Sequence, residues 1–123
     1  MYHKDLEAWK KSIELVTMVY SEVKNFPDDE RFGLVSQIKR AAISIPSNIA
    51  EGAARFSDKE MLHFLDISLG SLAELETQFI IAENLGYFNN TNLYKAFNEN
   101  IAIITGLKKY LLKKTKSLNH SIT

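Results

Sequence analysis

Residues 57–87 read SDKEMLHFLDISLGSLAELETQFIIAENLGY and decide the fold. The stretch opens on a capping box, in which Ser57 accepts the N–H of Glu60 and Glu60 reaches back to Ser57. It closes at Gly86, which can take the left-handed conformation that ends a helix. Between these signals, apolar or small residues recur every three or four positions, as on one helix face. They are Met61, Leu65, Ser68, Leu72, Leu75, Phe79 and Ala82.

The same periodicity on either side of this stretch predicts three more helices, so that the four cover about 6–25, 30–54, 58–85 and 91–114, with a frayed tail over 117–123. The turn Asn89-Asn90 separates the last two helices and supplies a cap. The predicted inward faces are Leu6, Trp9, Ile13, Val16, Tyr20 and Val23 in the first helix, Val35, Ile38, Ala42, Ile45, Ile49 and Ala53 in the second, and Leu93, Phe97, Ile101, Ile104, Leu107 and Leu111 in the fourth.

Pro46 lies inside the second predicted helix, where it removes one hydrogen bond and crowds the carbonyl of Ala42. The apolar stripe keeps its phase across Pro46, so we predict a kink. A break at Pro46, which would give five helices, is the alternative.

Four long helices with short connections favour antiparallel neighbours. The predicted fold class is therefore all-α, a single domain over residues 1–123 that forms an up-down-up-down four-helix bundle with a proline kink in its second helix.

The composition excludes several classes of protein. There is no cysteine among the 123 residues, which excludes disulfides and zinc–thiolate sites. Asp5 and Glu7 stand where a signal peptide needs an apolar core, and no apolar run approaches the ~20 residues of a membrane span. We expect a cytoplasmic protein without membrane contact. The formal net charge is zero, which argues against a uniformly basic surface.

Apolar residues also lie off the predicted inward faces, more than one bundle needs to bury. Scattered surface apolar residues are one explanation, and a self-association surface is the other. Ser68, Gly70, Ser71 and Ala73 would let a second helix approach residues 58–85 closely. The off-stripe residues are Leu15, Met18, Val19, Phe64, Ile67, Ile81, Tyr94, Ile103, Tyr110 and Leu112.

Catalytic and metal-binding patterns are weak. Glu60 and His63 form one Glu-x-x-His, whereas a di-iron bundle needs two copies and two further Glu residues. No Gly-x-Ser-x-Gly or glycine-rich phosphate loop occurs. Glu51, Glu74 and Glu76 fit surface pairing better than acid–base work. We expect no enzyme, no cofactor, no metal and no small-molecule substrate.

Charge is uneven in the predicted bundle. The start of the first helix, the turn between the second and third, and the end of the fourth share one pole, which carries an excess of lysine. Helix-dipole matching explains part of this, and attraction of RNA or DNA phosphates is the functional interpretation. Few aromatic residues there could stack on bases. The candidate contacts are Lys10, Lys11, Arg55, Lys108, Lys109, Lys113 and Lys114.

Residues 44–52, Ser-Ile-Pro-Ser-Asn-Ile-Ala-Glu-Gly, place polar side chains around Pro46, where Ser47 or Asn48 could donate to the carbonyl that Pro46 leaves free. Together with residues 33–42, 70–78 and 85–87, this run closely resembles the four helix bundle protein family, also called 23S rRNA intervening sequence or S23 proteins, over roughly residues 3–115. Lys39 departs from the arginine expected there. The motif residues form a candidate polar network, either structural or ligand-binding: Arg40, Ser44, Pro46, Asn48 and Glu51.

The resemblance implies a bacterial homo-oligomer, commonly a pentamer, and the family name records gene location without establishing a ribosomal role. A related group, the accessory variability proteins of diversity-generating retroelements, binds a reverse transcriptase and nucleic acid through a basic surface. We therefore expect a non-catalytic, homo-oligomeric bundle that binds RNA or a nucleic-acid enzyme through its basic pole. A structural or protein-interaction oligomer without a nucleic-acid partner is the alternative.

Overall fold

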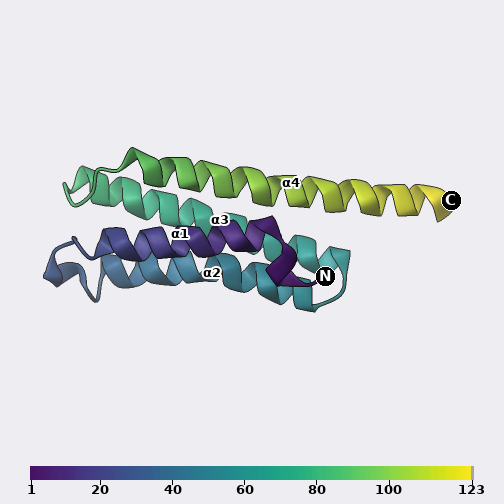
Figure 1. Cartoon of the computed structure of the whole chain (residues 1–123), viewed down its shortest axis with the longest axis horizontal. Coiled ribbons are helices and arrows are strands. Elements are labelled where there is room, and N and C mark those ends of the chain that lie inside the picture. The colour runs from purple at the N-terminus through teal and green to yellow at the C-terminus, as the bar shows by residue number, and fades with distance from the viewer. Residues whose placement is uncertain (123) are drawn as a thin grey trace.

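The computed structural model describes the backbone of residues 1–122 and the side chains of residues 1–116. Within it, α1 and α2 contact each other, as do α2 and α3, α3 and α4, and α1 and α4, while the diagonal pairs do not touch. Successive helices run in opposite directions (Figure 1), which confirms an all-α, four-helix bundle. The helices are α1 (Glu7–Val23), α2 (Leu34–Ala54), α3 (Asp58–Asn84) and α4 (Thr91–Ile122), with short 3-10 helices η1 (His3–Asp5) and η2 (Asp28–Glu30).

The ends of α3 follow the local signals of the sequence. The Ser57 hydroxyl accepts the Glu60 N–H at 3.3 Å. At the other end, Gly86 has a φ of +79°. The Gly86 N–H donates to the carbonyl of Glu83 and the Tyr87 N–H to that of Ala82, at 3.0 and 2.9 Å. This pair of bonds is a Schellman motif, which satisfies carbonyls that the helix end would otherwise leave open.

The core is centred on the inner faces of α2 and α3, where every residue predicted to point inward is buried. Phe79 is fully buried and meets the rings of Phe26, Phe88 and Phe97 at centroid distances of 6.0, 4.8 and 5.7 Å. This cluster joins α3 to α4 and to the segments that connect the helices. Aromatic contacts of this kind add to the stability that burial alone supplies.

The predicted inward face of the first helix is correct at Val23 but wrong at Ile13, while Leu6, Trp9 and Val16 pack against the core only in part. Ile13 of that face is 40% exposed, and Trp9, Val16 and Tyr20 are only half-buried. The residues that α1 buries lie about one position earlier on the same period: Ala8, Ser12, Leu15, Val19 and Val23. At the start of α1 the buried residues Ala8 and Ser12 are small, which lets this part of the helix approach its neighbours closely.

Two helix boundaries differ from the prediction by several residues, the start of α2 and the end of α4. The second helix begins at Leu34, because the acidic segment 28–30 forms the separate helix η2. It then runs unbroken through Pro46, so the five-helix alternative is wrong, and the kink stays a prediction. The last helix continues to Ile122, so the expected tail is helical over 117–122, in keeping with the lack of Gly and Pro after residue 106. Thr123 lies outside the described residues.

Candidate functional site

The basic end of the bundle is formed by the start of α1, the turn between α2 and α3, and the end of α4. Figure 1 shows the N-terminus and this turn at one end of the bundle, with α4 extending beyond them toward the C-terminus. Lys114 of α4 lies 3.4 Å from Asp58, the first residue of α3. The eight residues of α4 after Lys114 therefore continue past the start of α3, by about 12 Å at the standard helical rise. The end of α4 is thus the most projecting part of the basic end.

Carboxylates pair with five of the seven predicted phosphate contacts. Across the helices, Lys108 pairs with Asp66 and Lys114 with Asp58. Within single helices, Lys10 pairs with Glu7 at 3.5 Å and Arg55 with Glu51 at 2.9 Å. These pairs are at least partly exposed, and exposed ion pairs contribute little free energy, so phosphates can compete for the same cations.

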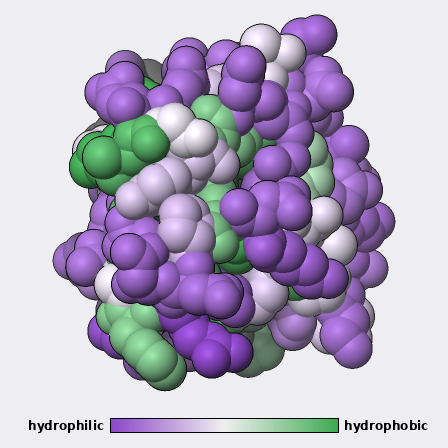
Figure 2. Space-filling view, turned by 90° about the vertical axis from the view of Figure 1, so that its left-hand side faces the viewer, coloured by the Kyte–Doolittle hydropathy of each residue, from purple (hydrophilic) through white to green (hydrophobic). Residues whose placement is uncertain are grey.

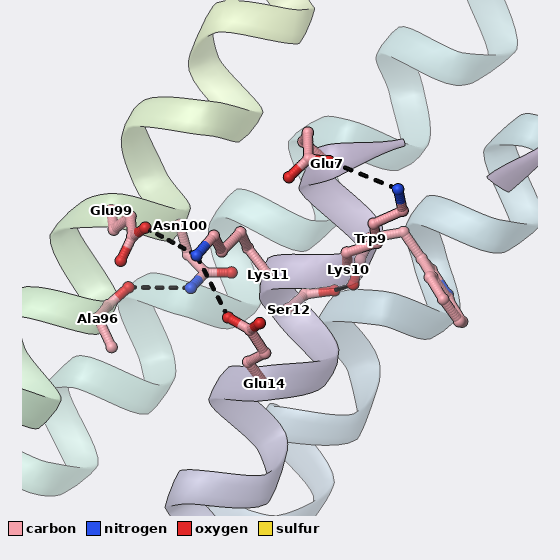
Figure 3. A network of polar contacts seen from close by, with 9 residues as sticks. All are labelled: Glu7, Trp9, Lys10, Lys11, Ser12, Glu14, Ala96, Glu99 and Asn100. Atoms are coloured by element: carbon pink, nitrogen blue, oxygen red, sulfur yellow. Dashed lines mark hydrogen bonds and ion pairs between the residues drawn. The ribbon is translucent and has the colours of Figure 1, made fainter. Parts of the chain in front are cut away.

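Lys11 belongs to a different surface. Figure 3 shows it reaching from α1 to Glu99 of α4 at 3.2 Å while it also contacts Glu14 at 3.4 Å. The hydrogen bonds that the Lys11 ammonium donates to the carboxylates of Glu99 and Glu14 raise the pKa of Lys11 above its ordinary value. Beside it the buried Asn100 amide donates to the Ala96 carbonyl. Lys11 therefore joins α1 to α4, and a bound phosphate would have to displace two carboxylates.

Lys109 and Lys113 are exposed, and neither has an ion-pair partner within residues 1–116. Lys116, one turn further along α4, is also exposed. These three side chains are the most available cations near the end of α4, and Lys116 lies on the part that projects past the start of α3. The opposite end of the bundle, where α1 meets α2 and α3 meets α4, is mostly hydrophilic with separate hydrophobic areas (Figure 2).

The motif around Pro46 forms a polar network between α2 and α3. The hydroxyls of Ser44 and Ser71 lie 2.8 Å apart, and Asn48 Nδ2 donates to both the Ser44 carbonyl and the Ser44 Oγ. Ser68 donates to the carbonyl of Ile45 at 2.9 Å. Asn48 thus donates near the proline, but its acceptors are the carbonyl and hydroxyl of Ser44. The predicted acceptor was the Ala42 carbonyl. The two serines of α3 lie against α2, within the same chain.

The other motif residues lie outside this network. Arg40 is exposed on α2, and Glu51 is exposed and paired with Arg55. Lys39, at the position where the family resemblance predicted arginine, lies over the Tyr20 ring at 4.9 Å. Pro46 is buried against the polar network on one side and lines a surface groove on the other.

That groove lies between the outward faces of α1 and α2. It has a volume of about 330 Å³ and is mostly apolar, and Ile13 and Ile43 on its walls are 40% and 46% exposed. A second hollow continues along α1 from Val16 to Lys24. The sequence analysis missed this surface because it assigned the same residues of α1 to the core. The groove is lined by Trp9, Ile13, Val16, Thr17, Ile43, Pro46, Ser47 and Ala50.

The residues considered as candidate catalytic or metal-binding groups lie on the outside of the bundle. Glu60 and His63 are exposed on α3, and Glu74 is exposed and accepts from Gln78 Nε2 at 3.2 Å. Over the residues that the structure describes, no three His, Asp or Glu side chains gather as a metal site would require. None of the described helices has the length and apolar character needed to cross a bilayer.

These features define a class: a four-helix bundle with an outward apolar groove, a serine-rich contact between α2 and α3, and one lysine-rich end. The chain belongs to the 23S rRNA-intervening sequence protein family, whose pattern it matches over residues 4–109. No curated protein matches it.

A solved structure shares the fold. It is a protein with unknown function from the S23 ribosomal protein family of Bacteroides thetaiotaomicron, with 22% sequence identity and a TM-score of 0.73. The similarity covers 83% of this chain and 95% of that chain. Neither the family nor this structure is tied to a known enzymatic activity.

Proposed function

We propose that this chain is a cytoplasmic, non-catalytic bundle that assembles with copies of itself and binds RNA through its basic end. The observation that carries the proposal is the lysine-rich end of α4, where Lys109, Lys113 and Lys116 are exposed and the helix then projects about 12 Å past the start of α3. Lysine ammonium groups bind phosphates as point charges, and release of counterions drives the association. A projecting helix can reach RNA phosphates without obstruction by the rest of the bundle.

Self-association is the second element of the proposal. The groove between α1 and α2 leaves Ile13 and Ile43 partly exposed, and α3 exposes Ile67 and Ile81 elsewhere on the surface. Between them, a Cβ added at Gly70 would meet nothing within 4 Å, so a second helix has room to approach. A contact between two different surfaces of identical chains is head-to-tail, and it forms a ring where the rotation between neighbours closes. A ring would multiply the lysine-rich end of α4.

The lysines are tested first by charge reversal. Lys109→Glu combined with Lys113→Glu should weaken binding to a structured rRNA fragment at low salt by at least about tenfold and reduce its salt slope by about two. The matched control is Lys24→Glu with Lys95→Glu, which makes the same charge change away from the basic end. An electrophoretic shift assay compares the two. Equal losses in both variants would contradict a local contact at α4.

The groove is tested by introducing charge into its walls. Ile13→Asp with Ile43→Asp should raise the dissociation constant of the assembly by about 100-fold or more, because buried apolar residues at the centre of an interface dominate binding. Light scattering after size exclusion should then show mass moving toward the 14.0 kDa of one chain. Phe32→Asp is the control, since Phe32 is 90% exposed and lies outside the groove. An unchanged mass in the groove variant would exclude this surface.

One observation favours a second function, a protein-interaction oligomer with no nucleic-acid partner. Most of the candidate cations are already paired with carboxylates of the same chain, including Lys108 with Asp66 and Lys114 with Asp58. Absence of any RNA shift at low salt, together with an intact oligomer, supports this second function over the first.

A further inference from the structure

Phe56 is an exposed aromatic residue at the basic end. It precedes the Ser57 cap of α3, and its side chain is 85% exposed. Its φ of +55° makes it the only non-glycine residue with a positive φ among those described. Left-handed backbone geometry is unfavourable for a residue with a Cβ. Because the Phe56 ring is exposed, burial of the ring contributes little free energy to offset this cost. The fold therefore presents this ring to solvent despite a local energetic cost.

A hollow of about 370 Å³ lies beside the ring. Its walls combine apolar and small residues of α2 and α3, including Gly52, Ala53 and Met61, with Lys114 of α4. The volume is in the range of small ligand pockets in proteins, which start near about 300 Å³. Aromatic, apolar and cationic groups thus meet around one concave surface.

Lys114 and the carboxylate of Asp58 both line this hollow. The ammonium of Lys114 is 3.4 Å from Asp58, but both side chains are partly exposed, so the pair is weak and exchangeable. Lys113 precedes Lys114 and is exposed. Tyr110, one turn earlier on α4, is 59% exposed. The sequence analysis found few aromatic residues that could stack on bases here, because the exposure of Phe56 depends on the turn conformation.

We propose that Phe56 is a stacking platform for an unpaired base of RNA, with Lys113 and Lys114 contacting the flanking phosphates. This inference rests on the proposed RNA binding and names its ligand class, single-stranded segments such as loops and ends. Bases in a regular duplex are stacked on one another and do not reach a protein ring, whereas unpaired bases offer a free face. Lys114 on the wall of the hollow and the exposed Lys113 next to it in the sequence favour a polyanion over an apolar protein segment.

The direct test compares single-stranded RNA with duplex RNA of equal length by fluorescence anisotropy. The full chain should bind the single strand more tightly. Phe56→Ala should weaken single-strand binding by about 5- to 100-fold, the range for loss of one base–aromatic stack, and leave duplex binding unchanged. Phe56→Tyr should retain the affinity. Phe56→Trp should show fluorescence quenching by single-stranded RNA that the wild-type chain, whose sole tryptophan is Trp9, does not show.

A second variant separates binding from folding. Phe56→Gly removes the ring and also relieves the left-handed geometry, so its Tm should rise by about 3 °C while single-strand binding falls as in Phe56→Ala. A more stable protein with weaker binding rules out unfolding as the cause.

The outcomes distinguish this inference from the proposed function. If neither RNA binds at low salt, both are overturned. If both RNAs bind equally and Phe56→Ala changes neither affinity, RNA binding stands and the stacking role is overturned. If Phe56→Ala lowers the oligomer mass and leaves RNA affinity unchanged, the ring belongs to a contact between copies, and the inference is again overturned.

Discussion

Phe79→Ala should lower the free energy of unfolding by about 3–5 kcal/mol, the usual cost of removing a fully buried phenylalanine. The Phe79 side chain has no exposed surface and meets three aromatic rings, of which Phe88 is the nearest at 4.8 Å. Its removal leaves a cavity that the rigid helices around it cannot close. Chemical denaturation followed by circular dichroism measures the loss.

The adjacent residue provides the control for Phe79. Ile80 is 46% exposed, so Ile80→Ala should cost less than about 1 kcal/mol. If the two variants lost the same free energy, Phe79 would not be at the centre of the core. Because the proposed self-association would link folding to assembly, both variants should be compared at the same protein concentration.

Gly52→Val should be the second most damaging of the substitutions considered, with a loss of about 3 kcal/mol from overpacking. A Cβ at this position would lie 2.8 Å from the Phe64 Cβ, 2.9 Å from the Met61 Sδ and 3.3 Å from the Met61 Cα. Two of these atoms belong to or adjoin the backbone of α3, so the clash can be relieved only by moving one helix. Thermal or chemical unfolding should show the loss directly.

The same substitution at Gly106 is a matched control. Gly106 lies in α4, and a Cβ there would meet nothing within 4 Å. Gly106→Val should change stability by less than about 0.5 kcal/mol, since valine and glycine differ little in helix propensity. An equally large loss at Gly106 would mean that backbone flexibility, and not the approach of α2 to α3, decides the effect.

The sequence was a good guide where an element has one apolar face and clear end signals. Ser57 and Gly86 mark the ends of α3, and the predicted stripes of α2 and α3 are all buried. Capping residues and hydrophobic periodicity are local properties of the sequence, so they can be recognised without knowing which helices pack together. The family resemblance, carried by residues 44–52, agrees with the match over residues 4–109.

The orientation of α1 could not be predicted in the same way. Trp9, Ile13, Val16 and Tyr20 form a better apolar stripe than Ala8, Ser12, Leu15 and Val19, yet the second set is buried. Hydrophobic periodicity identifies a helix face but does not say whether its own bundle or another chain covers it. The choice depends on how closely α1 packs, which small residues permit.

The candidate site depends on contacts between helices that sequence spacing does not reveal. Asp66 of α3 pairs with Lys108 of α4, a contact that the spacing of residues in the sequence does not predict. Ser71 was considered as a small residue for close packing, and it contacts the Ser44 hydroxyl of α2. Phe56 carries no motif signal, because its exposure follows from the backbone of a three-residue turn.

The affinity for a structured rRNA fragment across a salt series is the most direct test of the proposed RNA binding. If each chain engages about four phosphates, the affinity should fall roughly 50-fold between about 50 and 200 mM salt. A linear decrease of log affinity with log salt is the expected result. An affinity that does not change with salt, or no binding at the lowest salt, would contradict a role for the basic end of α4 in binding RNA.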